Sequence, residues 1–408
     1  MEEWKEYKIS EIIEEIAMGP FGSNIKVDNF IDLGIPVLNG SNLQGFKLNE
    51  DSFNYVSEEK ANSLGRANAF RGDVVITHRG TLGQIVYIPL DSKYERYVIS
   101  QSQFRLRLNQ NMIRPDFFVY FFHTRIGQHR ILMNASQVGV PALARPTSTF
   151  KEITIPVPPM EIQNRVMAIL LSLDDKIELN RRINENLEQQ AQALFKSWFV
   201  DFEPFKNGKF VDSELGKIPE GWKIGILSDI ANITMGQSPR GTSYNEIGNG
   251  ITFYQGRADF GNRFPSIRLF TTEPSRYAEP HSVLLSVRAP VGDINIAVEK
   301  CCIGRGLASI LSKDNHQSFI LYTMYSLKKE LDKFNSEGTV FGSINRFSIE
   351  NLKIVIPPID VMDEFEHLVS KIDDLLLYLF QETTRLEQLR DILLPRLMSG
   401  ELKITDIE

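Results

Sequence analysis

The chain has 408 residues, of which 42% are hydrophobic and 24% charged, and this composition is ordinary for a folded protein of two domains. Its aromatic content of 10% excludes a disordered chain. No apolar run reaches the ~20 residues that span a bilayer, and the N-terminus is acidic where a signal peptide needs basic residues. Cys301 and Cys302 are neighbours that cannot join distant segments, so we expect a reducing compartment, the cytoplasm.

The net charge of −7 argues against a nucleic-acid partner until the charges are located along the chain. Residues 1–160 hold equal numbers of basic and acidic side chains, and residues 221–360 have a small basic excess. Residues 66–145 alone carry eleven Lys and Arg against four acids. The acidic excess lies in 161–220 and 361–408. Any contact with a polyanion is therefore expected in the two neutral-to-basic segments.

The sequence contains an internal repeat. Trp4-Lys5 recurs as Trp222-Lys223, 218 residues later. The later matches come at smaller offsets and pair Met18–Ser23 with Met235–Pro239, Gly72–Gly83 with Val283–Gly292, Leu143–Arg145 with Ile344–Arg346, and Ile155–Pro159 with Ile354–Pro358. After the Pro-Pro pairs the offset stays at 199 residues. We therefore expect two copies of one unit whose front parts vary in loop length and whose back parts keep one register.

The front part of each copy combines short strands with short helices. Val74–Thr77 and Ile85–Ile88 are β-branched runs on either side of a glycine-containing loop, which predicts a hairpin. Phe117–Phe122 and Phe319–Tyr325 have the composition of buried faces of short helices. The two tryptophans of the repeat, Trp4 and Trp222, are expected to close the domain cores.

The back part of each copy predicts a long helix that begins at the Pro-Pro pair. In the second copy apolar residues alternate at spacings of four and three, interrupted only by Glu382: Val361, Phe365, Leu368, Ile372, Leu375, Leu379, Leu386, Leu389 and Leu393. The equivalent positions of the first copy are Ile162, Val166, Ile169, Leu173, Lys176, Asn180, Ile183, Leu187, Gln190 and Leu194. A period of 3.5 residues is typical of a coiled coil. The alternative is that each helix packs separately on its own domain.

We favour packing of the two helices on each other, because the shared register buries both apolar stripes together. A pseudo-two-fold axis would make the helices antiparallel. Lys176, Asn180 and Gln190 would then be polar residues in the seam. The predicted fold class is α+β, with domain 1 at 1–159, a central helix at 160–200, a polar linker at 201–220, domain 2 at 221–358 and a C-terminal helix at 359–400.

The usual catalytic signatures are missing from the sequence. Gly208-Lys209 and Gly216-Lys217 do not complete a phosphate-binding loop, and Gly304-Arg305-Gly306 lacks the third glycine of a dinucleotide site. The six histidines and two cysteines show no zinc spacing. Asp174-Asp175-Lys176 is expected to be a solvated patch. The alternatives to a non-catalytic protein are a stand-alone DNA methyltransferase or nuclease with unrecognised motifs, and an oligomerisation adaptor without DNA contact.

Polar loops recur at equivalent places of the two copies and form the candidate DNA-binding set. Arg79 and Arg288 each follow a predicted strand at a tight turn, and arginine can bind guanine edges or phosphate, whereas Asn and Gln suit adenine. The candidates in the first copy are Ser23, Asn39, Ser41, Asn42, Arg79, Thr81, Gln101, Gln103, Arg105, Gln137 and Arg145. Those in the second are Gln237, Ser238, Arg240, Gln255, Arg257, Arg288, Arg305 and Arg346. We expect no catalytic, cofactor-binding or metal-binding residues.

The motifs, taken in order, resemble the DNA-specificity subunit of type I restriction–modification enzymes. The resemblance rests on the repeat pairs above, on Gly34–Val37, and on the closing segment Leu393–Leu402. It implies two target-recognition domains that each read half of a split, asymmetric site in double-stranded DNA. It also implies that methyltransferase subunits dock near the coiled coil and that restriction subunits join the full complex. S-adenosylmethionine, ATP and Mg would be bound by those partners and not by this chain.

The fixed offset also predicts that helix length acts as a ruler between the two domains. Ile162–Leu194 would span roughly 50 Å at ~1.5 Å per residue, enough to hold the domains about one DNA turn apart. Four residues added near Gln189-Gln190 would lengthen the helix by ~6 Å, a little under two base pairs. We expect such a variant to keep both half-sites and to widen the gap between them.

Overall fold

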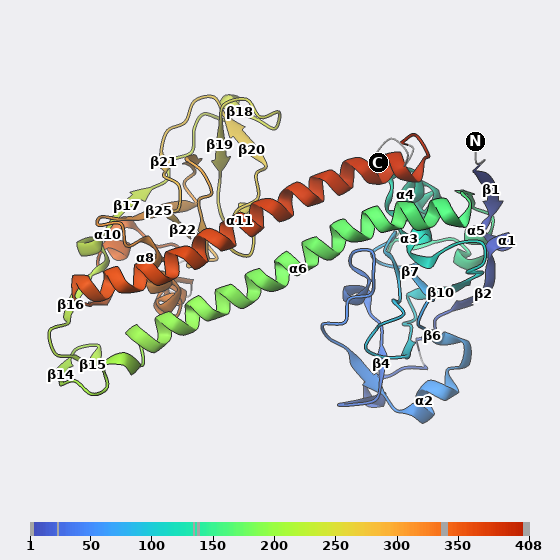
Figure 1. Cartoon of the computed structure of the whole chain (residues 1–408), viewed down its shortest axis with the longest axis horizontal. Helices are drawn as coiled ribbons and strands as arrows, with labels where there is room; N and C mark the ends of the chain where they lie inside the picture. Colours follow the sequence, from blue (N-terminus) through green and yellow to red (C-terminus); the bar gives the residue numbers. More distant parts are fainter. Residues whose placement is uncertain (1–3, 23, 134, 137–138, 336–341, 403–408) are drawn as a thin grey trace. The chain divides into compact units, whose positions relative to one another are not determined.

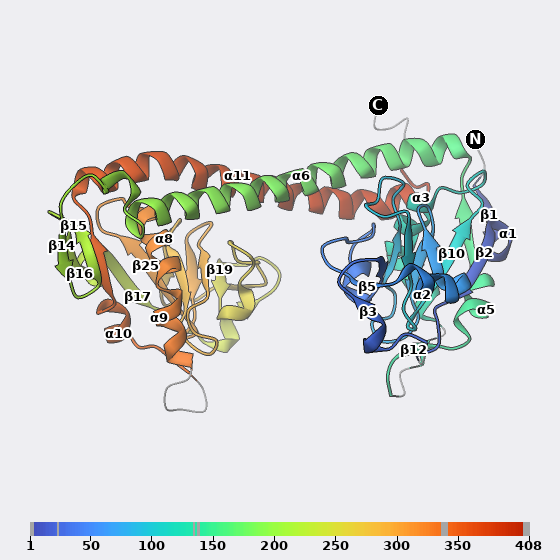
Figure 2. The ribbon, with the colours of Figure 1, turned by 90° about the horizontal axis from the view of Figure 1, so that it is seen from below.

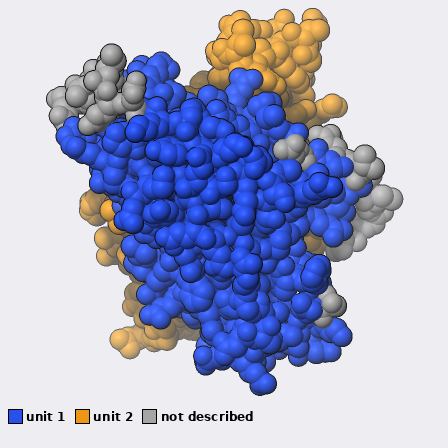
Figure 3. Space-filling view, turned by 90° about the vertical axis from the view of Figure 1, so that its right-hand side faces the viewer, with its two compact units in different colours: residues 1–177, 385–408 blue, residues 178–384 orange. Residues whose placement is uncertain are grey.

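The computed structural model describes residues 4–22, 24–133, 135–136, 139–335 and 342–402. The chain divides into two compact units, which Figure 3 distinguishes by colour: unit 1 comprises residues 1–177 and 385–408, and unit 2 comprises residues 178–384. Each unit holds the front part of one repeat together with half of each long helix. The units thus divide both long helices, whereas the domain boundaries expected from the sequence keep each helix whole.

Unit 1 contains a four-stranded antiparallel sheet with the strand order β2-β10-β7-β8, formed by Ile13–Met18, Gln103–Leu108, Val74–Thr77 and Ile85–Tyr87. A five-stranded sheet has the order β3-β5-β4-β9-β6, formed by Phe30–Ile31, Asn54–Val56, Ile35–Val37, Arg96–Val98 and Asn68–Phe70. Its β4–β9 pair is parallel. Two-stranded pairs are β1 (Lys5–Lys8) with β13 (Thr154–Val157), and β11 (Ala135–Ser136) with β12 (Ala142–Leu143). The helices are α1 (Ile9–Ile12), α2 (Glu58–Ser63), α3 (Pro115–His123), α4 (Arg125–Leu132) and α5 (Pro146–Lys151).

Unit 2 repeats the four-stranded sheet, the five-stranded sheet and the β1–β13 pair of unit 1. Its four-stranded sheet has the order β17-β25-β22-β23, formed by Ala231–Met235, Leu307–Ser312, Val283–Ser286 and Ile294–Ile296. Its five-stranded sheet has the order β18-β20-β19-β24-β21, formed by Tyr244–Asn245, Leu269–Thr271, Ile251–Tyr254, Cys301–Ile303 and Tyr277–Ala278, with β19–β24 parallel. β16 (Lys223–Ile226) pairs with β26 (Lys353–Ile356). The helices are α7 (Leu227–Ile230), α8 (Gln317–Ser326), α9 (Lys328–Asp332) and α10 (Arg346–Glu350).

The duplication predicted from the sequence is therefore present in the fold. The predicted hairpin of the first copy is β7 and β8, and both predicted aromatic helices form, as α3 and α8. In unit 2, α8 lies beside β25 (Figure 2), and in unit 1 α3 packs on β8. Both helices bury nearly all of their aromatic residues, because each packs on a sheet and on a long helix.

The long helices are α6 (Met160–Phe199) and α11 (Ile359–Met398), each unbroken over 40 residues (Figure 1). Within unit 2, Asn180 donates its amide to Glu382 at 2.7 Å, and the rings of Phe195 and Phe365 lie 5.8 Å apart. The partner number falls as the α6 number rises, so the helices pack antiparallel. They pack on each other as well as on the α/β cores, as the coiled-coil prediction requires and the separate-helix alternative does not.

The seam differs from the prediction. Asn180 is fully buried, but Lys176 and Gln190 are exposed, so their prediction as seam residues was wrong. Leu368, Leu375 and Leu389 are 43%, 42% and 44% exposed, although the heptad pattern placed them in the seam. Phe365 and Leu379 of the predicted stripe are buried, and the other buried α11 positions lie outside it: Met362, Val369, Leu376, Leu394, Leu397 and Met398. The buried stripe is turned toward the α/β core, because each helix half contacts a core in addition to the other helix.

The polar linker expected at 201–220 is an ordered part of unit 2. It contains a 3-10 turn, η4 (Glu203–Phe205), and a hairpin of β14 (Phe210–Ser213) and β15 (Gly216–Pro219). The rings of Phe202 and Phe205 lie 5.4 and 5.0 Å from that of Trp222. The Pro and Gly residues predicted a linker, but the aromatic residues between them bury apolar surface and fix the segment.

The cores contain the two tryptophans and the two cysteines of the repeat region. Trp222 is buried, and Trp4 packs at 6.2 Å from Phe117. Cys301 and Cys302 are free and buried in β24, and burial raises the pKa of Cys301 to about 12, so its thiol is un-ionised at neutral pH. Among the described residues, no helix combines the length and apolarity needed to cross a bilayer.

Candidate DNA interface

The turn after β7 presents Arg79 at the surface of unit 1. Arg79 forms a backbone bridge with Ala142, and the flanking hydrogen bonds run from Gly80 N to the oxygen of Pro141 at 2.9 Å and from Leu143 N to the oxygen of His78 at 2.8 Å. The turn is thus held on a second segment of backbone while the guanidinium stays exposed. Thr81 is exposed on the same turn.

Two further loops lie beside this turn. His78 N donates to the oxygen of Ser102 at 2.8 Å, and its ring Nε2 contacts the oxygen of Gln101 at 3.1 Å. Burial lowers the pKa of His78, so its ring is neutral at physiological pH. Gln101 and Asn39 line one cavity of about 190 Å³, which brings the predicted Asn39 loop next to the Gln101 loop. Asn39 accepts hydrogen bonds from the backbone and hydroxyl of Ser41 at 2.8 and 2.6 Å.

Unit 2 presents Arg288 in the same way. Arg288 forms a backbone bridge with Ser343, Val287 N donates to the oxygen of Gly306 at 2.9 Å, and Ile344 N donates to the oxygen of Val287 at 3.0 Å. These bonds match those around Arg79 one for one. The two arginines predicted from the repeat therefore occupy the same place in two copies of one topology.

Four other second-copy candidates lie on loops that meet near the Arg288 turn, where Gly306 bonds to Val287: Gln237, Ser238, Gln255 and Arg305. Arg305 N donates to the hydroxyl of Ser238 at 3.3 Å, and Gln237 N donates to the oxygen of Ile303 at 3.0 Å. Gly304 lies so close to Gln255 that an added Cβ would be 2.8 Å from the Gln255 oxygen. Gly304 therefore allows the loop bearing Arg305 to approach the loop bearing Gln255.

Three predicted DNA contacts are buried, so the structure corrects them. Asn42 uses its side chain to bind the oxygens of Asn49 and Ser52, at 3.0 and 2.9 Å. Gln103 is fully buried and accepts a hydrogen bond from Ser100 N at 2.9 Å. Arg105 is 3% exposed. Their polar groups are directed into the protein and stabilise its loops and strands.

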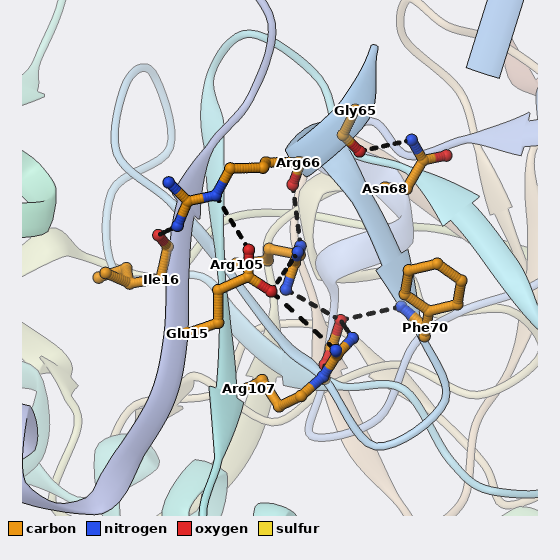
Figure 4. Close-up of polar contacts among 9 residues, drawn as sticks. Glu15, Ile16, Gly65, Arg66, Asn68, Phe70, Arg105 and Arg107 are labelled. Atoms are coloured by element: carbon orange, nitrogen blue, oxygen red, sulfur yellow. Dashed lines mark hydrogen bonds and ion pairs between the residues drawn. The ribbon is translucent and has the colours of Figure 1, made fainter. Parts of the chain in front are cut away.

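Arg105 is part of a charged network that Figure 4 shows between β2, β10 and the segment before β7. It binds Glu15 at 2.8 Å and Asp73 at 3.4 Å, while Arg107 binds Asp73 at 2.9 Å and Arg66 binds Glu15 at 3.0 Å. Burial raises the pKa of Asp73 against the pull of these arginines. The pKa of Glu15 is lowered, since the bonds from Arg105 and Arg66 outweigh its partial burial. The network serves the fold and leaves no guanidinium of Arg105 for DNA.

The remaining candidate arginines differ in their ion pairs, although all of them are exposed. Arg257 pairs with Asp293 at 2.7 Å and Arg346 with Glu350 at 2.7 Å, although both arginines are more than half exposed. Arg145 is exposed and adopts a left-handed conformation, with φ of 46°, ahead of α5. Arg240 is exposed. The predicted contacts Ser23 and Gln137 lie outside the described residues.

The sequence reasoning did not identify three groups that the structure makes prominent. Phe21 is 83% exposed beside Gln101, on the loop that contains the Gly-Pro-Phe-Gly motif. Asp174 was expected to be solvated, but it is mostly buried and binds Arg390 at 2.8 Å. Asp373 binds Arg263 at 2.5 Å. The sequence did contain a signal for both aspartates. Asp174 and Asp373 are separated by the 199-residue offset of the repeat, so they occupy equivalent positions of the two long helices.

Among the described residues, no group of His, Cys, Asp or Glu has the arrangement of a metal site. A family model described as the type I restriction modification DNA specificity domain matches residues 1–189 and 219–388. This match covers most of the chain in two blocks, as the duplicated fold does. The chain belongs to the DNA specificity subunits of type I restriction–modification enzymes. These subunits are a non-catalytic family.

Relatives of the specificity-subunit family agree with this assignment. The chain is 30% identical over 408 residues to a specificity subunit assigned to the type I restriction enzyme MjaX of Methanocaldococcus jannaschii, covering 99% of this chain and 94% of the relative. It is 26% identical to the HindI specificity subunit of Haemophilus influenzae, covering 78% and 83%. The crystal structure of the S subunit of a type I restriction–modification system from M. genitalium matches with a TM-score of 0.63 at 16% identity, covering 97% and 96%, and shares the fold.

Proposed function

We propose that this specificity subunit reads a bipartite, asymmetric site in double-stranded DNA, one half with each α/β core. The observation that carries the proposal is the pair of equivalent turns with exposed Arg79 and Arg288, each supported by the same backbone bonds. An exposed arginine on a rigid turn is suited to a guanine edge or a phosphate.

The two half-sites are expected to differ in sequence, because the side chains around the equivalent turns differ. The turn of unit 1 is accompanied by Asn39, Thr81 and Gln101, and that of unit 2 by Arg305 and Gln255. Amide side chains suit adenine, and a second arginine suits guanine or phosphate. The buried Asn42, Gln103 and Arg105 are left out of this proposal.

We also propose that methyltransferase subunits dock on the outer face of α11. Within unit 2, Leu368 and Leu375 are seven residues apart and exposed, as is Tyr378 on the adjoining row of the helix. A row of exposed apolar residues on one helix face is typical of a protein interface. Since the chain is a non-catalytic subunit, the partner that covers this face would supply the methyl transfer. S-adenosylmethionine would bind to that partner, and ATP and Mg to restriction subunits.

Helix length would set the gap between the half-sites. The parts of α6 and α11 that attach to the cores include Asp174 and Arg390 in unit 1 and Glu188 and Asp373 in unit 2. The segment from Asp174 to Glu188 rises by about 21 Å at ~1.5 Å per residue. An insertion near Gln189-Gln190 would disturb the packing of Phe195 in unit 2, so an insertion within that segment is the better test.

The test is reconstitution with the cognate methyltransferase subunits, followed by mapping of methylated bases in random DNA. The expected result is one split site, with no methyl transfer from labelled S-adenosylmethionine by the specificity subunit alone. A single continuous site would contradict the bipartite proposal. Absence of salt-dependent DNA binding by the complex would contradict DNA reading altogether.

A further inference from the structure

A buried tyrosine–aspartate hydrogen bond joins each α/β core to a long helix. In unit 1, Tyr120 of α3 donates its hydroxyl to Asp174 of α6. In unit 2, Tyr322 of α8 donates to Asp373 of α11 at 2.7 Å. Both tyrosines are 1% exposed, and the two aspartates are related by the 199-residue offset of the helices. The same bond is therefore built twice, once per unit.

In unit 1 the aspartate also binds the other long helix. Arg390 of α11 donates to Asp174 at 2.8 Å, and its guanidinium lies 5.1 Å from the centre of the Phe46 ring. Phe46 stacks on Tyr120, with ring centres 4.1 Å apart and planes inclined by 19°. α6, α11 and the core of unit 1 thus meet in one cluster, which we call the unit 1 anchor: Phe46, Tyr120, Asp174 and Arg390.

In unit 2 the cation comes from the core instead of a helix. Arg263, between η6 (Arg257–Asp259) and β20, binds Asp373 of α11 at 2.5 Å and also binds Glu188 of α6. Arg263 also donates to the hydroxyl of Tyr322 at 3.3 Å. We call this cluster the unit 2 anchor: Glu188, Arg263, Tyr322 and Asp373. It again joins a core to both helices.

We propose that the two anchors are positioning elements that fix the angle of each recognition core on the coiled coil, and so determine how strictly the gap between half-sites is enforced. The proposal rests on the bipartite function above. Apolar packing holds a core on a helix without fixing a direction, whereas a hydrogen bond to a charged group is directional. Each recognition turn belongs to the same core as the tyrosine, so loosening the anchor lets that turn move along the DNA.

The experiment replaces one hydroxyl at a time in the reconstituted methyltransferase complex. Tyr120→Phe and Tyr322→Phe each remove the bond to the helix and keep the ring. Tyr55→Phe and Thr252→Val are matched controls, because each removes a hydroxyl bond within the same unit, to Tyr94 at 3.1 Å and to Glu299 at 2.5 Å, away from the anchors and from the candidate DNA-binding loops. Methylation rates are measured on duplexes with the mapped gap and with gaps one base pair shorter and longer.

For the anchor variants we expect relative methylation of the altered-gap duplexes to rise about tenfold, equivalent to about 1.4 kcal/mol, with both half-sites unchanged. The control variants should keep the wild-type ratio. Unchanged gap preference in folded anchor variants would overturn the proposal, as would an equal rise in the controls. Failure of the bipartite function is distinguishable, because the wild-type complex would then show no gap preference.

A second variant covers the case in which an anchor tyrosine variant does not fold. Phe46→Leu removes the ring under Arg390 and leaves the Tyr120–Asp174 bond in place. A relaxed gap with intact half-sites supports the anchor role. A gap as strict as that of the wild type contradicts it.

Discussion

The two units share one topology and differ in the charges that attach them to the helices. In unit 1 the ion pair of Asp174 and Arg390 joins the two helices, and the core contributes only a hydroxyl and a ring. In unit 2 the core contributes Arg263, and the helices contribute the two carboxylates of Glu188 and Asp373. Two copies of the same backbone topology can therefore carry their charged residues at different positions.

This difference predicts unequal consequences of losing the cation. Without Arg263, two carboxylates would face each other in a buried site, and burial already raises the pKa of Asp373 against the pull of Arg263. Without Arg390, one aspartate would remain, still bonded to Tyr120. The core of unit 2 is thus joined to the helices by ion pairs in addition to the hydroxyl bond, whereas the core of unit 1 is joined by the hydroxyl bond and by the Phe46 ring.

The largest expected effect is that of Arg263→Leu. We expect it to lower the free energy of unfolding by about 3–5 kcal/mol, because it leaves buried charges unpaired. Arg390→Leu should cost about 1–3 kcal/mol, since a single charged acceptor is left. Urea denaturation followed by hydrogen exchange in each unit measures both. Equal losses would remove the contrast between the anchors.

The loss in Arg263→Leu should depend on pH. A carboxyl whose folded pKa is raised contributes stability below its unfolded pKa and loses it as the pH rises through the folded pKa. Removing Arg263 leaves Asp373 facing Glu188, with Tyr322 as a neutral neighbour, so its pKa should rise further. Lowering the pH from about 7.5 to about 5 should therefore return part of the lost stability to the variant and less to the wild type. A deficit that is independent of pH would show that the carboxylates do not repel.

Arg105→Leu tests whether the buried Arg105 serves stability, in contrast to the exposed Arg79, which is proposed to contact DNA. We expect a loss of about 3 kcal/mol in stability, because Asp73 and Glu15 each lose a buried partner. Since Arg105 does not reach the surface, the half-site preference of the folded variant should stay unchanged. Altered base preference with normal stability would return Arg105 to the DNA interface.

Arg79→Ala and Arg288→Ala compare the two recognition turns directly. Each should weaken binding by about 1–3 kcal/mol through its own half-site if it reads a base. A phosphate contact would instead give a loss independent of sequence and a shallower dependence on salt. Arg165→Ala on α6 is the matched control, because that arginine is exposed and pairs only with Glu161 among the described residues. Unchanged affinity in both turn variants would place recognition in other loops.

The sequence was sufficient for the architecture because repeated motifs and helix register are local patterns. The hairpin at Val74–Thr77 and the turns of Arg79 and Arg288 follow from such patterns. Burial is not local, and that is why Arg105 looked like a DNA contact and Asp174 like a solvated residue. Their environments depend on Glu15 and Arg390, which lie 90 and 216 residues away.

The predicted seam positions of α11 were wrong for a related reason. A heptad pattern describes contact between two helices, but α11 also packs on the cores, and the additional contact turns its buried face. Leu375 then lies outside while Leu376 is buried. The heptad pattern alone could not predict that these leucines are exposed, because their exposure depends on how the cores pack on the helix.

The most direct test of the account inserts four residues into each long helix between the anchors, after Ile177 in α6 and after Thr384 in α11. Each helix is lengthened by ~6 Å, and four residues come close to one turn of ~3.6, so the packing is rotated only modestly. Mapping of methylated sites by the reconstituted complex should show both original half-sites with one or two additional base pairs between them. The original gap, or new bases in either half-site, would contradict the account.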